Sequence, residues 1–166
     1  MKRCLVIPDS FKGTMTSIEV CSIMSAEILK HFPDCDIISV PIADGGEGTV
    51  DCFLKALEGA KIPIRVKGPF FEEIDAFYGI VGKTAIIEMA AVVGLDKGKG
   101  ELNPAKATTY GVGQLIADAV KKGCTDIILG LGGSCTNDAG AGAAAALGTK
   151  FYNSEKEIFV PTGGTL

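Results

Sequence analysis

Residues 3–32 read RCLVIPDSFKGTMTSIEVCSIMSAEILKHF and contain a strand, a loop and a helix in succession. Residues 3–8 form a short apolar run that is typical of a strand, and residues 9–14, mostly polar with one glycine, are expected to form a loop. Thr16 and Glu19 have the spacing of a capping box, and apolar residues then recur at helical intervals. This order predicts the first unit of an α/β fold.

The same order of elements repeats over the next 35 or so residues. We expect a strand over 36–42, a loop over 43–48, a helix over 49–57 and a third strand over 61–66. Strands separated by single helices pair in parallel, and ligands of such sheets bind beyond the carboxyl ends of the strands. Both loops therefore lie at the expected binding edge.

The pattern changes near residue 70. Two β-rich runs, 74–81 and 84–89, are joined by Gly82 and Lys83, which predicts a hairpin and not a crossover. A helix over 109–122, a strand over 126–131, a glycine-rich loop over 132–138 and a helix over 139–147 then restore the earlier order. We therefore expect two α/β lobes, one built from residues 1–69 and the other from residues 70–166.

The composition limits the classes of function. Of 166 residues, 47% are hydrophobic, which is enough for a packed core. The net charge of −4 makes nucleic acid and anionic membranes poor partners. A single histidine argues against a Ser-His-Asp triad or a zinc site of several imidazoles. The six cysteines form no C-x-x-C, and no apolar stretch approaches about 18 residues, so we expect a reduced, cytoplasmic protein.

The strongest candidate binding site is the glycine-rich segment 130–142, which follows a buried strand and opens a helix. Backbone N–H groups of such a turn, together with a helix N-terminus, suit a phosphate. The candidate phosphate contacts are Gly132, Gly133, Ser134, Thr136 and Asn137. Asp138 is a candidate metal ligand or proton acceptor, and the alternative is a helix cap at Asn137 or Asp138. The segment has no Walker lysine, and its G-x-G-x-x-A match lies inside the helix, so a P-loop and a nicotinamide cofactor are not favoured.

The loop after the first strand brings a carboxylate, a hydroxyl and an ammonium group within four residues. These are Asp9, Ser10 and Lys12. Such a set binds an anion or a metal ion and screens a developing negative charge. The alternative is a solvated turn without a function.

The loop after the second strand has two carboxylates among three glycines. Its candidate site residues are Asp44, Gly45, Gly46 and Glu47. Asp44 and Glu47 are expected to orient a hydroxyl or bind magnesium, whereas the alternative is a capped helix start.

Two more residues remain open between a structural and a binding role. Glu88 ends an apolar strand, where a buried carboxylate needs a partner, so it is either paired structurally or directed into the cleft. Thr109, with Thr108 before it, is either an N-cap of the following helix or a substrate contact.

Five ordered motifs resemble the bacterial type of glycerate kinase. They are PDSFKG (8–13), PIADGGEGT (41–49), IEMAA (87–91), TTYG (108–111) and GLGGSCTND (130–138). The resemblance implies transfer of the γ-phosphoryl group of ATP to a hydroxyl of D-glycerate, usually giving 2-phosphoglycerate, with Mg²⁺. It also implies a Rossmann-like or flavodoxin-like lobe, the beginning of an inserted α/β lobe, and an active site between them. The family's chain is a little over twice this length, which implies an N-terminal portion.

Phosphoryl transfer requires mainly positioning and charge stabilisation, which suggests roles for these residues. We expect the glycine-rich loop to cradle a phosphoryl group and Lys12 to neutralise its charge. Asp44 or Asp138 would orient the attacking hydroxyl or bind magnesium, and spacing does not decide between them. The competing interpretation is a noncatalytic half that binds a phosphorylated ligand and needs a C-terminal partner. Both require the three loops to lie together.

Overall fold

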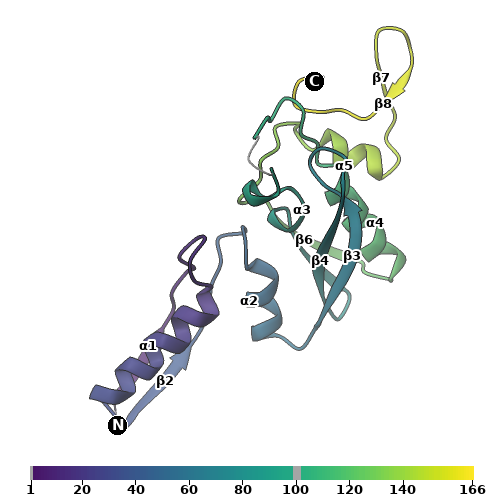
Figure 1. The fold of residues 1–166 in the computed structure, drawn as a ribbon. Helices are drawn as coiled ribbons and strands as arrows, with labels where there is room; N and C mark the ends of the chain where they lie inside the picture. The colour runs from purple at the N-terminus through teal and green to yellow at the C-terminus, as the bar shows by residue number, and fades with distance from the viewer. Residues whose placement is uncertain (1, 99–101) are drawn as a thin grey trace.

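A computed structural model describes residues 2–98 and 102–166 of the chain. Its first part, which we call the N-terminal unit, contains β1 (Lys2–Val6), α1 (Ser17–His31) and β2 (Cys35–Ser39). β1 and β2 pair in parallel, from Lys2 opposite Cys35 to Val6 opposite Ser39. Figure 1 shows this unit, in purple and blue, extending away from the rest of the molecule.

α1 begins where its sequence predicts. Thr16 is the N-cap, its hydroxyl accepts the backbone N–H of Glu19, and the Glu19 carboxylate accepts the N–H of Thr16. This reciprocal bonding satisfies two helix donors that would otherwise lack partners. The local capping signal therefore sets the length of the loop between β1 and α1.

The second part is a four-stranded sheet with the order β3-β4-β5-β6. Its strands are β3 (Ala60–Lys67), β4 (Glu73–Val81), β5 (Thr84–Glu88) and β6 (Asp126–Gly130). β3, β4 and β5 pair antiparallel, and β5 and β6 pair in parallel. The predicted hairpin is confirmed, because Val81 lies opposite Thr84 across a turn in which Gly82 has a φ of 59°. A positive φ is easily accommodated by glycine at this position.

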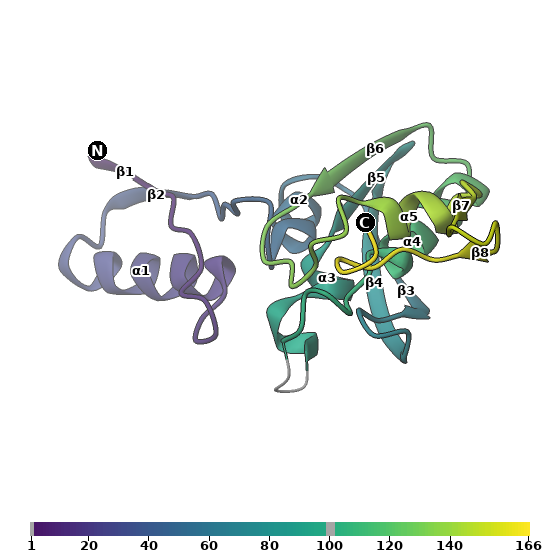
Figure 2. The same cartoon turned by 90° about the horizontal axis from the view of Figure 1, so that it is seen from above.

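Helices cover both faces of this sheet, as Figures 1 and 2 show. On one face lies α4 (Tyr110–Lys121), whose Leu115 belongs to the main core together with Tyr78 and Ile87. On the other lies α2 (Thr49–Ala56), which packs on β4 and β5. The remaining elements are α3 (Ala90–Val93), the 3-10 helix η1 (Leu95–Gly98), α5 (Ala141–Ala146), β7 (Phe151–Tyr152) and β8 (Ile158–Phe159).

The third strand does not extend the first sheet, and that prediction is wrong. β3 pairs antiparallel with β4, and the preceding helix α2 packs on the same sheet. The alternation of Ile62, Ile64 and Val66 with more polar neighbours fits an edge strand with one buried face. The change of sheet therefore comes between β2 and β3, before residue 70, whereas the division into lobes 1–69 and 70–166 stays a prediction.

The N-terminal unit has one covered and one open face. α1 covers the face that carries Val6 and Ser39, since Val6 is buried and the Ser39 hydroxyl bonds to that of Ser25. The opposite face is apolar yet exposed, at Leu5, Ile7, Ile38 and Val40. Parallel sheets are normally covered on both faces, so this one lacks a cover within the described residues.

Candidate active site

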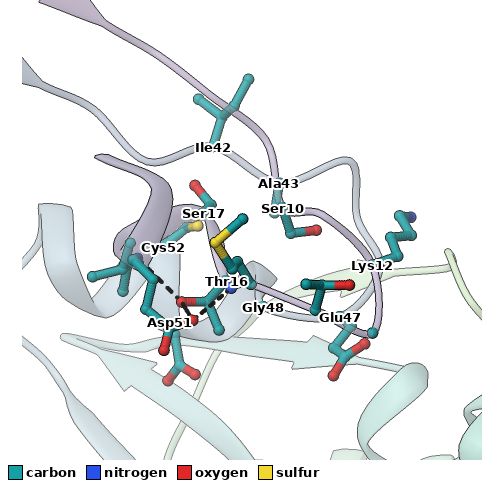
Figure 3. Close-up of a pocket in the computed structure, with 15 residues that line it drawn as sticks. Ser10, Lys12, Thr16, Ser17, Ile42, Ala43, Glu47, Gly48, Asp51 and Cys52 are labelled. Atoms are coloured by element: carbon teal, nitrogen blue, oxygen red, sulfur yellow. Dashed lines mark hydrogen bonds between the residues drawn. The ribbon is translucent and has the colours of Figure 1, made fainter. Parts of the chain in front are cut away.

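The loops after β1 and β2 come together at the carboxyl ends of these two strands. They line a pocket of about 450 Å³ together with the first turns of α1 and α2 (Figure 3). Ser10, Lys12 and Glu47 are among the predicted site residues that line it. Because β1 and β2 are parallel neighbours, their following loops leave the sheet at one edge, as the sequence predicts.

Lys12 and Asp44 join the two loops directly. Lys12 Nζ donates to Asp44 Oδ2 at 2.9 Å, and both side chains are more than half exposed. This hydrogen bond and the charge of Asp44 raise the pKa of Lys12. The hydrogen bond from Lys12 and another from the N–H of Gly46 hold the pKa of the Asp44 carboxyl below its ordinary value. Both groups are therefore charged near neutral pH and open to solvent.

Asp9 and Ser10 form the turn just before Lys12. The backbone N–H of Ser10 donates to Asp9 Oδ1 at 2.6 Å, which holds both residues in one local arrangement. The charges of Asp9 and Glu47 also favour the protonated form of Lys12 and contribute to its raised pKa. Three carboxylates of these two loops, those of Asp44, Asp9 and Glu47, therefore act on the ammonium group of Lys12.

The glycine-rich loop after β6 lies against the loop after β2. The N–H of Gly132 donates to the carbonyl of Gly45 at 3.1 Å. A Cβ at Gly132 would lie 2.8 Å from the backbone N of Gly46, and one at Gly130 would overlap the carbonyl oxygen of Gly45. Two backbones approach this closely only without side chains, so these glycines serve loop packing.

The next residues of this loop are held by a short bridge to residues 93–95. Leu95 donates its N–H to the carbonyl of Gly133, and Cys135 donates its N–H to Val93. The hydroxyls of Ser134 and Thr136 bond to each other at 2.6 Å. Asn137 is exposed, so it is free to contact a ligand but is not directed into the pocket by any hydrogen bond among the described residues.

Asp138 is buried away from this site. It is 1% exposed, its Oδ2 accepts the N–H groups of Thr109 and Gly142 and the hydroxyl of Thr109, and its Oδ1 accepts the N–H of Gly140. A carboxylate with this many donors has little capacity left for a metal ion or a substrate proton. Asp138 therefore connects the starts of α4 and α5, although the N-cap residue of α5 is Gly140 and not Asn137 or Asp138. A catalytic role of Asp138 stays a prediction.

Thr109 takes part in the same connection. It is the N-cap residue of α4, but its hydroxyl does not cap that helix. The hydroxyl donates to Asp138 and accepts the N–H of Ala143 in α5, and the residue is 2% exposed. Its hydroxyl is thus engaged inside the fold, and the substrate contact stays a prediction.

We predict that Asp138→Asn destabilises the chain without a local effect on the pocket. The amide keeps one acceptor but turns an NH₂ group toward backbone donors, which costs about 1–3 kcal/mol for the lost buried bonds. Urea unfolding measures this cost. Asp126→Asn is the control, since Asp126 is exposed and, among the described residues, its carboxylate accepts a bond only from its neighbour Thr125. Equal stability of the two variants would contradict the role given to Asp138.

Glu88 also faces the protein interior. It is 2% exposed, and its carboxylate accepts the N–H of Val50 at 2.9 Å and that of Gly48 at 3.4 Å. The sequence left its role open, and the structure pairs it with the start of α2. It does not line the pocket.

The pocket has lining residues that the sequence analysis did not propose as site residues. They come from the first turns of α1 and α2 and from the segment between β2 and α2: Ser17, Glu19, Ile42, Asp51 and Cys52. Asp51 and Cys52 could have been predicted, because they lie in the first helical turn after a candidate loop. Within residues 2–98 and 102–166, no three His, Cys, Asp or Glu side chains form a group suited to a metal ion.

None of the helices that the structure describes has the length and apolar character needed to cross a membrane.

The chain was compared with families and with individual proteins. Residues 4–166 match the family model described as the glycerate kinase family. The chain is 45% identical to a glycerate kinase of Bacillus cereus and 42% identical to the glycerate 2-kinase of Escherichia coli K12, in both cases over 99% of this chain and 44% of the relative. The chain thus spans less than half the length of these curated relatives.

A solved structure agrees with this result. The crystal structure of a Salmonella typhimurium LT2 protein assigned as glycerate kinase 2 superposes with a TM-score of 0.82 and 36% identity, over 99% of this chain and 46% of that one. The match of a family model to nearly the whole sequence is decisive for membership. This chain belongs to the glycerate kinase family.

Proposed function

We propose that this chain is the N-terminal portion of an ATP-dependent glycerate kinase, which transfers the γ-phosphoryl group of ATP to D-glycerate to give 2-phosphoglycerate. The observation that carries the proposal is the Lys12–Asp44 pair, which joins the loops after β1 and β2 in a chain of this family. A charged ammonium and an ionised carboxylate, both open to solvent, provide the charge stabilisation and positioning that phosphoryl transfer needs. The cytoplasm is the proposed location, because all six cysteines are free thiols.

In this proposal Lys12 binds the transferred phosphoryl group. Its raised pKa keeps it positively charged throughout the physiological range. Asp44 orients the attacking hydroxyl and does not act as a strong base, because its pKa lies below the ordinary carboxyl value. The glycine-rich loop contributes backbone N–H groups near Gly133, while Ser134 and Thr136 contribute hydroxyls.

Mg²⁺ fits the exposed part of the site and not the buried one. Asp44 and Glu47 are exposed carboxylates, the hard oxygen ligands that Mg²⁺ prefers, whereas the oxygens of Asp138 are occupied. Of the two metal ligands predicted, we therefore retain Asp44. When bound, Mg²⁺ would neutralise charge on the phosphate oxygens of ATP.

The charge of the pocket supports the view that the described part is incomplete. Lys12 is the cation among the described lining residues, against the carboxylates of Glu19, Glu47 and Asp51. ATP and D-glycerate are both anions, so a site that binds them together needs further positive charge. We propose that the remaining portion of a longer chain supplies it.

The open apolar face of β1 and β2 supports the same proposal. Leu5 is 56% exposed and Ile38 43% exposed, and they lie opposite each other on adjacent strands. Burying such a face is favourable by about 25 cal/mol per Å² of apolar area. We propose that the C-terminal portion packs on this face and buries it.

The test compares three samples for ADP formation from ATP, Mg²⁺ and D-glycerate. They are this chain alone, this chain mixed with the C-terminal portion of the Bacillus cereus relative, and a chimera in which that portion continues the chain after Leu166. We call the chimera the completed chain. We expect no turnover by the chain alone and clear turnover by the completed chain.

The arms separate the possible outcomes. Turnover only in the mixture and the completed chain supports an N-terminal portion that needs a partner. ADP formed with another hydroxy acid but not with D-glycerate would reassign the substrate. A completed chain that folds but forms no ADP above the acid-free blank would contradict the kinase proposal, and binding of a phosphorylated ligand would then favour the noncatalytic alternative.

A further inference from the structure

Glu88 occupies the N-terminus of α2 from a distant strand. It is the last residue of β5, and its two oxygens accept the N–H groups of Gly48 and Val50. Burial raises the pKa of the Glu88 carboxyl, with a small further rise from Asp51, while the two N–H groups and Lys61 oppose the rise. The backbone of α2 thus provides the main compensation for burying this carboxyl.

This contact uses N–H groups that the start of a helix could otherwise offer to an anion. The N-terminus of a helix carries unpaired N–H groups and a partial positive charge, which favour an anion. In α2 the carboxylate of Glu88 bonds to two of these groups, and the carbonyl of Gly46 accepts the N–H of Thr49. These N–H groups are therefore not available to bind a substrate phosphate at the start of α2.

A series of hydrogen bonds connects Glu88 to Asp44 through residues 46–49. Glu88 holds Gly48, which is the N-cap of α2 with a φ of 90°. The N–H and hydroxyl of Thr49 both bond to the carbonyl of Gly46, at 3.3 and 2.8 Å. The N–H of Gly46 in turn donates to Asp44 Oδ1 at 3.1 Å. The loop is thus held at one end by Glu88 and at the other by Lys12.

We propose that Glu88 is a positioning residue, which fixes the start of α2 and, through residues 46–48, the direction of the Asp44 carboxylate. The inference rests on the proposed function for its kinetic consequence only. Glu88 does not line the pocket, so its effect on the reaction must pass through the loop. This dependence distinguishes it from a residue that only stabilises the fold.

A double-mutant cycle in the completed chain tests this dependence. We expect Glu88→Gln to lower kcat about tenfold to hundredfold, with little change of KM, because a misplacement of about 1 Å has effects of this size. In an Asp44→Asn background the same change should lower kcat less than about threefold, since residues that act through one another are not additive. An equal loss in both backgrounds would overturn the proposal. Glu88→Asp replaces the variant if Glu88→Gln does not fold.

Tyr78→Phe is the matched control. Tyr78 is fully buried in the same sheet, and its hydroxyl donates to Asp118 at 2.7 Å, away from the pocket. Its removal also deletes a hydrogen bond of a buried side chain, so stability should fall while kcat stays within about twofold. A loss of kcat equal to that of Glu88→Gln would mean that destabilisation alone explains both.

Amide hydrogen exchange gives a readout that needs no activity. In the completed chain, Glu88→Gln should reduce protection at Gly46, Gly48 and Val50, whereas Tyr78→Phe should leave these amides unchanged. Unchanged protection in Glu88→Gln would overturn the proposal even in an inactive protein. An inactive parent chain with the expected exchange pattern would instead contradict the proposed function and leave the positioning of the loop supported.

Discussion

Lys12→Ala in the completed chain should lower kcat by about 10² to 10³, which is the range for losing a charged group that stabilises a transition state. The ammonium group is the cation among the described residues of the pocket, so the variant leaves the developing charge there without a direct partner. The melting temperature should change by less than about 2 °C, because exposed ion pairs contribute little to stability. Steady-state kinetics and thermal unfolding of the same sample measure both.

A matched variant tests whether the loss of kcat depends on the position of Lys12 or only on the loss of a positive charge. Lys30 is also exposed and pairs with a carboxylate, Glu27, at 2.7 Å, but it lies near the far end of α1. Lys30→Ala removes the same charge and should leave kcat within about twofold. If Lys12→Ala and Lys30→Ala turn over at similar rates, Lys12 has no part in the mechanism.

The convergence of the first two loops could be predicted because it depends on local signals and one topological rule. The capping box of Thr16 and Glu19 marks the start of α1, and the parallel order of β1 and β2 places both following loops at one edge. The Lys12–Asp44 contact follows from that placement. The sheet to which β3 belongs depends instead on where α2 packs. The sequence of α2 does not show which sheet this helix packs on.

The directions of the carboxylates could not be predicted from residue type. An aspartate at a loop end suits a metal ion, a substrate or a helix start equally well, and only tertiary packing decides between them. Asp44 ends in solvent beside Lys12, whereas Asp138 and Glu88 are buried against backbone N–H groups. Burial of a carboxylate is tolerated only with such donors, so the two buried groups could have been recognised only from the neighbours that supply them.

The glycines of the third loop show the same limit. A glycine that permits a positive φ, one that exposes N–H groups to a phosphate and one that lets two backbones touch look identical in a sequence. Gly130 and Gly132 prove to be of the last kind. Their contact with Gly45 and Gly46 brings the third loop next to the first two, so it supports a common site even though it reduces the number of free donors.

Gly130→Ala tests this contact and should have the second large effect. The added Cβ would overlap the carbonyl oxygen of Gly45 and lie 3.0 Å from its carbonyl carbon, and backbone atoms cannot move aside as a side chain can. We expect a loss of about 3 kcal/mol in the free energy of unfolding of this chain, the upper end of the usual cost of overpacking. The loops should also separate, lowering kcat of the completed chain about tenfold or more.

Gly123→Ala is the control for the substitution itself. Gly123 follows α4 with a φ of 90°, and a Cβ there meets no atom within 4 Å. That variant should lose about 1 kcal/mol from backbone strain and keep its kcat, because no loop of the site is displaced. Gly130 has no positive φ, so any loss of stability in Gly130→Ala must come from the contact of the new Cβ and not from backbone strain. A Gly130→Ala protein as stable and as active as Gly123→Ala would mean that the third loop does not depend on the second for its place beside Lys12 and Asp44.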